Sequence, residues 1–274
     1  MSVALPEFEY LQDLLHRHSA IVLSEDKHYL VEARLAPIAR DLGLATVEEV
    51  VREVQKGADR GLQERVVEAM TTNETSWFRD IRPFDALRDV IFPEIIERNR
   101  ATRTLSIWSA ACSTGQELYS IALLLDEHFP EVEHWHLELL GTDLNNTVVE
   151  RARAGSFSGL EINRGLPAKM IALHFRRDGA NFVISDRVRA QVRFERRNLA
   201  EPWTGLSRFD LILLRNVLIY FDQPTKKRIL EAAGRQLADG GHLALGGAES
   251  PLGITDVFTP RIVGGATFYR TEAK

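Results

Sequence analysis

The chain has little cysteine and no excess of positive charge. Its one cysteine among 274 residues is Cys112, so no disulfide can form within the chain. The 34 Lys and Arg residues face 39 Asp and Glu residues, which gives a formal net charge of −5. Proteins that hold nucleic acid need clustered cations to neutralise phosphates. We therefore expect no nucleic-acid partner.

Long apolar runs are also missing. The longest candidates, Ile121 to Leu125 and Leu211 to Leu214, are far below the roughly 20 residues that cross a bilayer. The start MSVALPEFEYLQDLL carries acids where a signal peptide carries a basic flank. These features predict a cytoplasmic protein without direct membrane insertion, with one large domain or two small ones.

The chain changes its hydrophobic pattern along its length. Up to about residue 70, apolar residues such as Phe8, Leu11 and Leu14 recur at helical spacing, which predicts a small all-helical domain over residues 1–70. Pro37 is expected to break or kink one of its helices. A polar stretch with a proline, TTNETSWFRDIRP, predicts a linker over residues 71–83.

Residues 84–274 show the rhythm of an α/β domain. The strand-like runs LSIWSA, HLELLGT, FDLILL and GHLALG alternate with helical segments, which predicts βαβ units on a doubly wound parallel sheet. The rhythm is interrupted at about 156–197 by a helix-like LPAKMIALHF and two alternating runs, NFVIS and QVRFE. We interpret these two runs as a hairpin insertion.

Candidate binding residues follow the predicted strands. In such sheets ligands bind beyond the carboxyl ends of the strands. A turn of small residues, Ala110 to Gly115, precedes a helix whose first amides can bind an anion, and Asp143 at a strand end can accept hydrogen bonds from a ribose. Further polar or bordering residues follow two other strands: Asn198, Leu199, Arg215 and Asn216. Each alone can be a packing turn, a cap or an ion-pair partner, so the signal is their recurrence at one sheet edge.

The turn lacks the G-x-G-x-x-G fingerprint, and no G-K-[ST] phosphate loop is present. A nucleoside without a pyrophosphate therefore fits better than a dinucleotide or a nucleoside triphosphate. S-adenosylmethionine is such a ligand, and its cationic sulfonium favours a nearby acid such as Glu117. Glu117 can equally be an acid that the helix dipole favours in the first turn.

The motifs TNETSWFRD, WSAACSTGQELYS, ARAGSF and RNVLIYFD, in this order, resemble the CheR family of chemoreceptor glutamate methyltransferases. The resemblance covers most of the chain. It implies a small helical N-terminal domain followed by a Rossmann-like, S-adenosylmethionine-dependent methyltransferase domain that carries a small antiparallel β-subdomain. The fold class is therefore α/β.

The resemblance also implies the site. The residues that match cofactor-binding positions are Asn73, Thr75, Arg79, Glu117, Asp143, Asn198, Leu199, Arg215 and Asn216. Arg79 and Tyr220 match the residues at the methyl-transfer centre and are the expected catalytic residues. The cofactor is S-adenosylmethionine, the product S-adenosylhomocysteine, and no metal is expected.

The implied reaction is methylation of glutamate side chains on the cytoplasmic domain of a bacterial chemoreceptor, at receptor arrays, giving glutamyl methyl esters in chemosensory adaptation. A glutamate with a pKa near 4.3 is already ionised, so it needs no general base. Two alternatives stay open: a methyltransferase of this fold acting on another carboxylate or on a receptor of a non-motility pathway, and a non-catalytic sensory module that binds the cofactor. We expect a monomer.

Two segments of the chain are relevant to how it would bind a receptor. Some family members bind a receptor's C-terminal pentapeptide as a strand added to the β-subdomain. Here the loop RRDGANFVIS is short and lacks the extra glycine-containing segment, so we expect no dependence on that tether. In the helix that resembles the receptor-docking helix, Arg34 and Arg40 are retained, although they can also be a solvated face.

Overall fold

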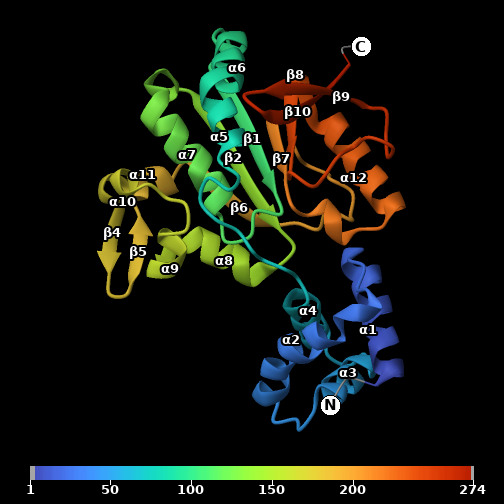
Figure 1. Cartoon of the computed structure of the whole chain (residues 1–274). Coiled ribbons are helices and arrows are strands. Elements are labelled where there is room, and N and C mark those ends of the chain that lie inside the picture. Colours follow the sequence, from blue (N-terminus) through green and yellow to red (C-terminus); the bar gives the residue numbers. More distant parts are fainter. Residues whose placement is uncertain (1–3, 273–274) are drawn as a thin grey trace. The chain divides into compact units, whose positions relative to one another are not determined.

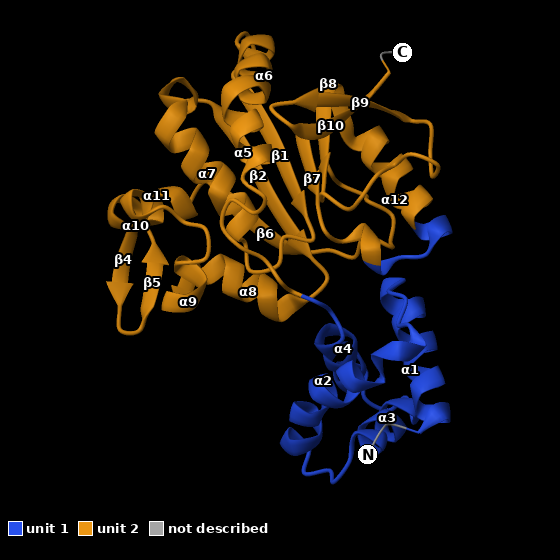
Figure 2. Cartoon of the chain, viewed as in Figure 1, with its two compact units in different colours: residues 1–72, 220–225 blue, residues 73–219, 226–274 orange. Residues whose placement is uncertain are grey.

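The computed structural model describes residues 4–272 (Figure 1). The chain forms two compact units, which are coloured separately in Figure 2. Unit 1 comprises the residues up to Thr72 together with Tyr220–Thr225, and unit 2 comprises Asn73–Ile219 and the chain from Lys226 onward.

Unit 1 is helical. Its elements are α1 (Leu5–Ser19), the short 3-10 helix η1 (Glu25–Lys27), α2 (His28–Asp41), α3 (Val47–Gln55) and α4 (Arg60–Ala69). The predicted apolar stripe of α1 is confirmed, because Phe8, Leu11 and Leu14 are all 1% exposed or less. These side chains form part of the core of unit 1, and their burial stabilises the packing of the helices.

The helix α2 continues through Pro37, so the predicted break does not occur. A proline removes one backbone donor. On the same helix Val31, Leu35 and Ile38 are buried, and this packing holds the helix together across the lost hydrogen bond.

Residues 220–225 are tied to the end of α1. The Val22 N–H donates to the Tyr220 carbonyl at 2.9 Å, and Ile21 forms an antiparallel bridge with Phe221. His16 Nε2 lies 3.0 Å from Asp222 Oδ2. Tyr220 is therefore held within unit 1.

Unit 2 is built on a seven-stranded sheet in the order β6-β2-β1-β7-β8-β10-β9. Its strands are β1 (Thr104–Ala110), β2 (His136–Asp143), β6 (Val192–Arg196), β7 (Phe209–Leu214), β8 (Leu237–Leu245), β9 (Phe258–Val263) and β10 (Ala266–Thr271). The pairs from β6 to β8 are parallel, and β10 is antiparallel to β8 and β9. After β1 the chain adds strands on one side and then, from β7, on the other. This reversal between β1 and β7 is where sheets of this kind bind ligands.

Helices flank this sheet (Figure 1). Beside the large sheet lie α5 (Arg82–Ala86), the π-turn η2 (Leu87–Ile91), α6 (Phe92–Asn99), α7 (Gln116–His128), α8 (Asn146–Ala154) and α12 (Gln223–Gln236). The helices α9 (Gly159–Ile162), α10 (Ala168–His174) and α11 (Asp186–Arg189) accompany the small sheet described below, and the remaining short helices are η3 (Pro130–Val132) and η4 (Leu218–Tyr220). Strand β7 is buried at every position, which confirms the prediction of a central strand. None of the described helices combines the length and the apolar character that a membrane span needs.

The insertion differs from the predicted hairpin. The small sheet consists of β3 (Ser156–Ser158), β5 (Asn181–Ile184) and β4 (Phe175–Asp178) in that order. The run NFVIS pairs with the polar run FRRD across a two-residue turn, not with QVRFE.

The run QVRFE instead forms β6, parallel to β2 at the edge of the large sheet. The polar segment between the two runs folds as the helix α11, so it does not make a tight turn. Phe194 of β6 is 4% exposed in the core of unit 2, and this burial outweighs a local pairing with β5.

Candidate active site

The turn between β1 and α7 has an unusual backbone. Ala111, Ser113 and Gly115 have φ values of 60°, 52° and 91°. A Cβ on Gly115 would lie 2.9 Å from Phe194 Cζ, so this position also needs the small residue for packing. The left-handed residues bend the chain sharply at the carboxyl end of β1, where a ligand can approach the backbone.

Asp143 joins this turn to the neighbouring strands. Its side chain is 7% exposed, and its Oδ2 accepts the Ser113 N–H at 2.8 Å. The Ser113 hydroxyl donates to the Asn73 carbonyl at 2.8 Å, and the Arg197 N–H donates to the Asp143 carbonyl at 2.8 Å. Ser113 and Arg197 thus bond Asp143 directly, and Ser113 links the segment of Asn73 to it.

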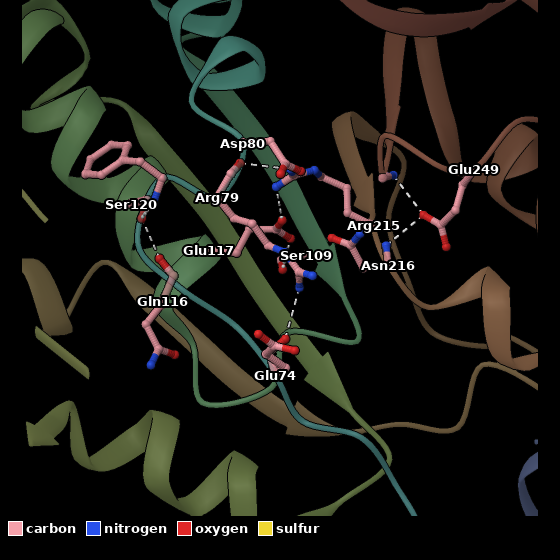
Figure 3. A network of polar contacts seen from close by, with 12 residues as sticks. Glu74, Arg79, Asp80, Ser109, Gln116, Glu117, Ser120, Arg215, Asn216 and Glu249 are labelled. Carbon is pink, nitrogen blue, oxygen red and sulfur yellow. Dashed lines mark hydrogen bonds and ion pairs between the residues drawn. The ribbon is translucent and has the colours of Figure 1, made fainter. Parts of the chain in front are cut away.

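Arg215 is the centre of a second network, shown in Figure 3. Its side chain is 1% exposed. Nη1 donates to Glu117 Oε2 at 2.7 Å, and Nη2 donates to Asp80 Oδ2 at 2.7 Å and to the Arg79 carbonyl at 2.9 Å. Glu117 Oε1 accepts the Ser109 hydroxyl at 2.8 Å. A buried guanidinium is tolerable because two carboxylates neutralise it.

The segment that contains Arg79 is strained and firmly held. Phe78, Asp80 and Ile81 have φ values of 46°, 70° and 48°, which are costly for residues with a Cβ. The Phe78 N–H donates to Ser120 Oγ at 3.0 Å, and Arg79 Nη1 donates to the Glu74 carbonyl at 3.0 Å (Figure 3). Strain of this kind persists only where surrounding contacts fix the backbone, as at many functional sites.

The remaining predicted residues have fewer hydrogen bonds to the networks around Asp143 and Arg215. Asn198 Oδ1 accepts the Ala200 N–H at 3.0 Å just beyond β6, and Leu199 is 8% exposed. Thr75 is half-buried in the segment before Arg79. The structure thus brings the predicted residues of unit 2 to the carboxyl edge of the sheet and its covering segment, whereas Tyr220 belongs to unit 1.

Two functional candidates were missed by the sequence reasoning. Asp80 binds Arg215, and Glu249 accepts the N–H groups that follow β7. Asp80 lies inside the TNETSWFRD motif, next to the predicted Arg79. The only signal for Glu249 was an acid placed three residues after Gly246, at the end of a strand.

The donor set fits a zwitterionic nucleoside. The Nε–H of Arg215 is buried and has no hydrogen-bond partner among residues 4–272, as expected of a donor that a bound ligand satisfies. The acids Glu117 and Asp143 suit a cation and a ribose diol, while Arg79 suits a carboxylate. Burial raises the pKa of the Cys112 thiol, which therefore stays protonated and is a poor nucleophile. Within residues 4–272 no group of three or more His, Cys, Asp or Glu side chains is placed to hold a metal ion.

Comparisons with known proteins match nearly the whole chain to one family. Residues 73–262 match the family model described as the CheR methyltransferase, SAM binding domain, and residues 6–71 match the CheR methyltransferase, all-alpha domain. A chemotaxis protein methyltransferase of Pseudomonas putida is 38% identical over 261 residues, which cover 93% of this chain and 94% of the relative. Chemotaxis protein methyltransferase 1 of Pseudomonas aeruginosa gives the same identity and coverage.

A chemotaxis protein methyltransferase of Vibrio parahaemolyticus is 36% identical over 266 residues, covering 94% of each chain. Among solved structures, the glycopeptide N-methyltransferase MtfA complexed with S-adenosyl-L-methionine aligns with 73% of this chain and 69% of its own, at 14% identity and a TM-score of 0.35.

Proposed function

The chain belongs to the CheR methyltransferase family and is an S-adenosylmethionine-dependent methyltransferase, and from this premise we propose that it methylates glutamate side chains of a bacterial chemoreceptor. The product is a glutamyl methyl ester on the cytoplasmic domain of the receptor, formed during chemosensory adaptation. The relatives named above are chemotaxis proteins, which supports this substrate class.

The proposed cofactor site uses the residues around both networks. Asp143 accepts hydrogen bonds from the ribose, and Glu117 faces the cationic end of the methionyl part. The other proposed contacts are Asn73, Thr75, Arg79, Asn198, Leu199, Arg215 and Asn216. The bound cofactor supplies an electrophilic methyl group on its sulfonium sulfur.

The protein's part in the reaction is alignment. The acceptor carboxylate is ionised at neutral pH and needs no base. Arg79 holds this carboxylate by paired hydrogen bonds, and Arg215 fixes the backbone of Arg79 through its carbonyl. Tyr220 is the second residue that we assign to the methyl-transfer centre. Most of the rate gain comes from holding the acceptor carboxylate in line with the methyl group, because a reaction between two freely diffusing molecules then becomes a reaction within one complex.

The wider arrangement is also a proposal. Residues 1–70 form the helical domain, 71–83 the linker that contributes to the cofactor site, and 84–274 the methyltransferase domain with its insertion at about 156–197. We propose a cytoplasmic monomer that is recruited to receptor arrays without needing a pentapeptide tether.

The observation that carries the catalytic assignment is the clamp of Arg215 on the Arg79 carbonyl, Asp80 and Glu117. A module that only sensed the cofactor would need the nucleoside contacts but not a fixed Arg79. The test is incubation with methyl-labelled S-adenosylmethionine and membranes that contain the cognate chemoreceptors. Release of label as methanol by mild alkali is expected; stable label, or none from protein shown to bind the cofactor, would contradict the proposal.

A further inference from the structure

The carboxylate of Glu249 accepts four backbone N–H groups, two on each oxygen. Oε2 accepts those of Asn216 at 2.7 Å and Gly246 at 2.8 Å. Oε1 accepts those of Val217 at 2.9 Å and Leu218 at 2.7 Å. Figure 3 shows Glu249 reaching toward Asn216 from the segment after β8. One side chain thus bonds three consecutive amides after β7.

Three amides converge on one point because the chain bends at Asn216, whose φ is 59°. Consecutive N–H groups in such a bend form a concave anion-binding nest. The nest follows directly after Arg215 and opens the short helix η4. Its conformation therefore sets the direction in which the Arg215 and Asn216 side chains leave the backbone.

We propose that Glu249 is a positioning residue for the cofactor site, and this inference rests on the proposed function. It holds the backbone of residues 216–218 in the bent form, which keeps Arg215 on Glu117 and Asn216 beside the cofactor. Water could satisfy the same amides, but it would not fix three of them relative to one another.

A neighbouring glycine pair allows a second perturbation of the same segment. A Cβ on Gly246 would lie 2.6 Å from Asn216 Nδ2 and 2.7 Å from Glu249 Oε2. A Cβ on Gly247 would meet nothing within 4 Å. Gly246→Ala therefore disturbs the nest, and Gly247→Ala is its matched control.

The experiment measures S-adenosylhomocysteine affinity by calorimetry and the amide proton shifts of residues 216–218 in the ligand-free full chain. Glu249→Gln presents an NH₂ group to two of the four amides, so it loses their hydrogen bonds. We expect its affinity to fall by about tenfold or more, because hydrogen bonds to charged groups are strong. Gly246→Ala should weaken binding similarly, Glu249→Asp should recover part of the affinity and of the amide shifts, and Gly247→Ala should match the wild type.

Wild-type affinity in Glu249→Gln and Gly246→Ala, with altered amide shifts, would overturn the inference, because the nest could then change without consequence for the site. If Glu249→Gln does not fold, Glu249→Asp and Gly246→Ala decide. A wild-type chain that binds S-adenosylhomocysteine but methylates no receptor would refute the proposed function, while the affinity comparison would still decide the role of Glu249.

Discussion

At the scale of single residues, the site depends on buried charges that neutralise one another. Arg215 is 1% exposed and spans Glu117, Asp80 and the Arg79 carbonyl. Removing one member of such a group leaves an uncompensated charge, which costs more than the loss of an exposed ion pair. The side chains of this network therefore act as a unit.

Arg79→Ala is predicted to lower turnover on receptor substrate more than it lowers cofactor affinity. The reason is that Arg79 is proposed to align the acceptor carboxylate, and misplacement of a reacting group costs on the order of a hundredfold in rate. Single-turnover methylation and S-adenosylhomocysteine calorimetry measure the two quantities. The exposed Arg177→Ala on β4 is the control, and equal losses in turnover and affinity for Arg79→Ala would count against this role.

His242 is predicted to make stability depend on pH. It is fully buried in β8, and burial, together with the cations Arg270 and Arg261, lowers the pKa of His242 to about 3, although Glu94 opposes the shift. The unfolded side chain has a pKa of about 6.5, so below this pH it binds a proton while the folded side chain stays neutral. Stability from this group is therefore complete above pH 6.5 and falls as the pH drops toward 3.

Between pH 6.5 and 5 the loss should be about 2 kcal/mol. Urea unfolding of His242→Gln should show a shallower decline over this range than the wild type. The exposed His134→Gln serves as control, and parallel pH profiles for the wild type and His242→Gln would show that the buried imidazole is not the source.

At the scale of elements, the sequence predicted the helices and strands whose buried residues recur at a regular spacing. The helices of unit 1 and the strands β1, β2, β7 and β8 follow from their spacing of apolar residues. The partner of NFVIS could not be found in this way, because FRRD of β4 is mostly polar and exposed. Strand β6 was assigned to the wrong sheet because alternation alone does not identify the neighbouring strand.

The strand-end rule located Asp143, Asn198 and Arg215 because topology brings the carboxyl ends of parallel strands to one edge. It could not locate Glu249, which reaches this edge from the segment after β8 only through its side chain. Contacts of this kind depend on three-dimensional packing, and no local spacing of residues encodes them.

The turn after α9 is predicted to support the linker segment. Gly165 has a φ of +101°, and a Cβ there would lie 2.2 Å from the Trp77 carbonyl oxygen. Gly165→Ala should lower the free energy of unfolding by about 1–3 kcal/mol and also weaken S-adenosylhomocysteine binding, because Trp77 precedes Arg79. Urea unfolding and calorimetry measure both effects.

Gly159→Ala is the matched control for this prediction, since a Cβ there meets nothing within 4 Å. It should change stability by less than about 0.5 kcal/mol. Equal stability of the two variants would mean that the backbone at Trp77 moves aside without a loss of folding free energy.

The small sheet is predicted not to bind a receptor-tail peptide. Its β4–β5 turn consists of only Gly179 and Ala180, whereas the family resemblance implies a longer segment in members that bind such a peptide. Calorimetry with a C-terminal receptor pentapeptide should detect no binding in the micromolar range. A micromolar dissociation constant would show that the short loop suffices for strand addition.

At the scale of the whole molecule, the candidate site of unit 2 is assembled from segments spread over most of the chain, from Asn73 to Glu249. Hydrogen bonds of Ser113, Arg197 and Arg215 join these segments. The network therefore exists only in the folded chain, and the proposed activity should be lost when unit 2 unfolds.

We propose that this chain esterifies glutamate side chains of a chemoreceptor. The most direct measurement is tandem mass spectrometry of receptor peptides after incubation with S-adenosylmethionine, with and without mild alkali. We predict a methyl group on the side chain of one or more glutamates in the cytoplasmic domain, removed by the alkali. A methyl group on nitrogen, or receptors left unmethylated by protein that binds the cofactor, would contradict the proposed reaction.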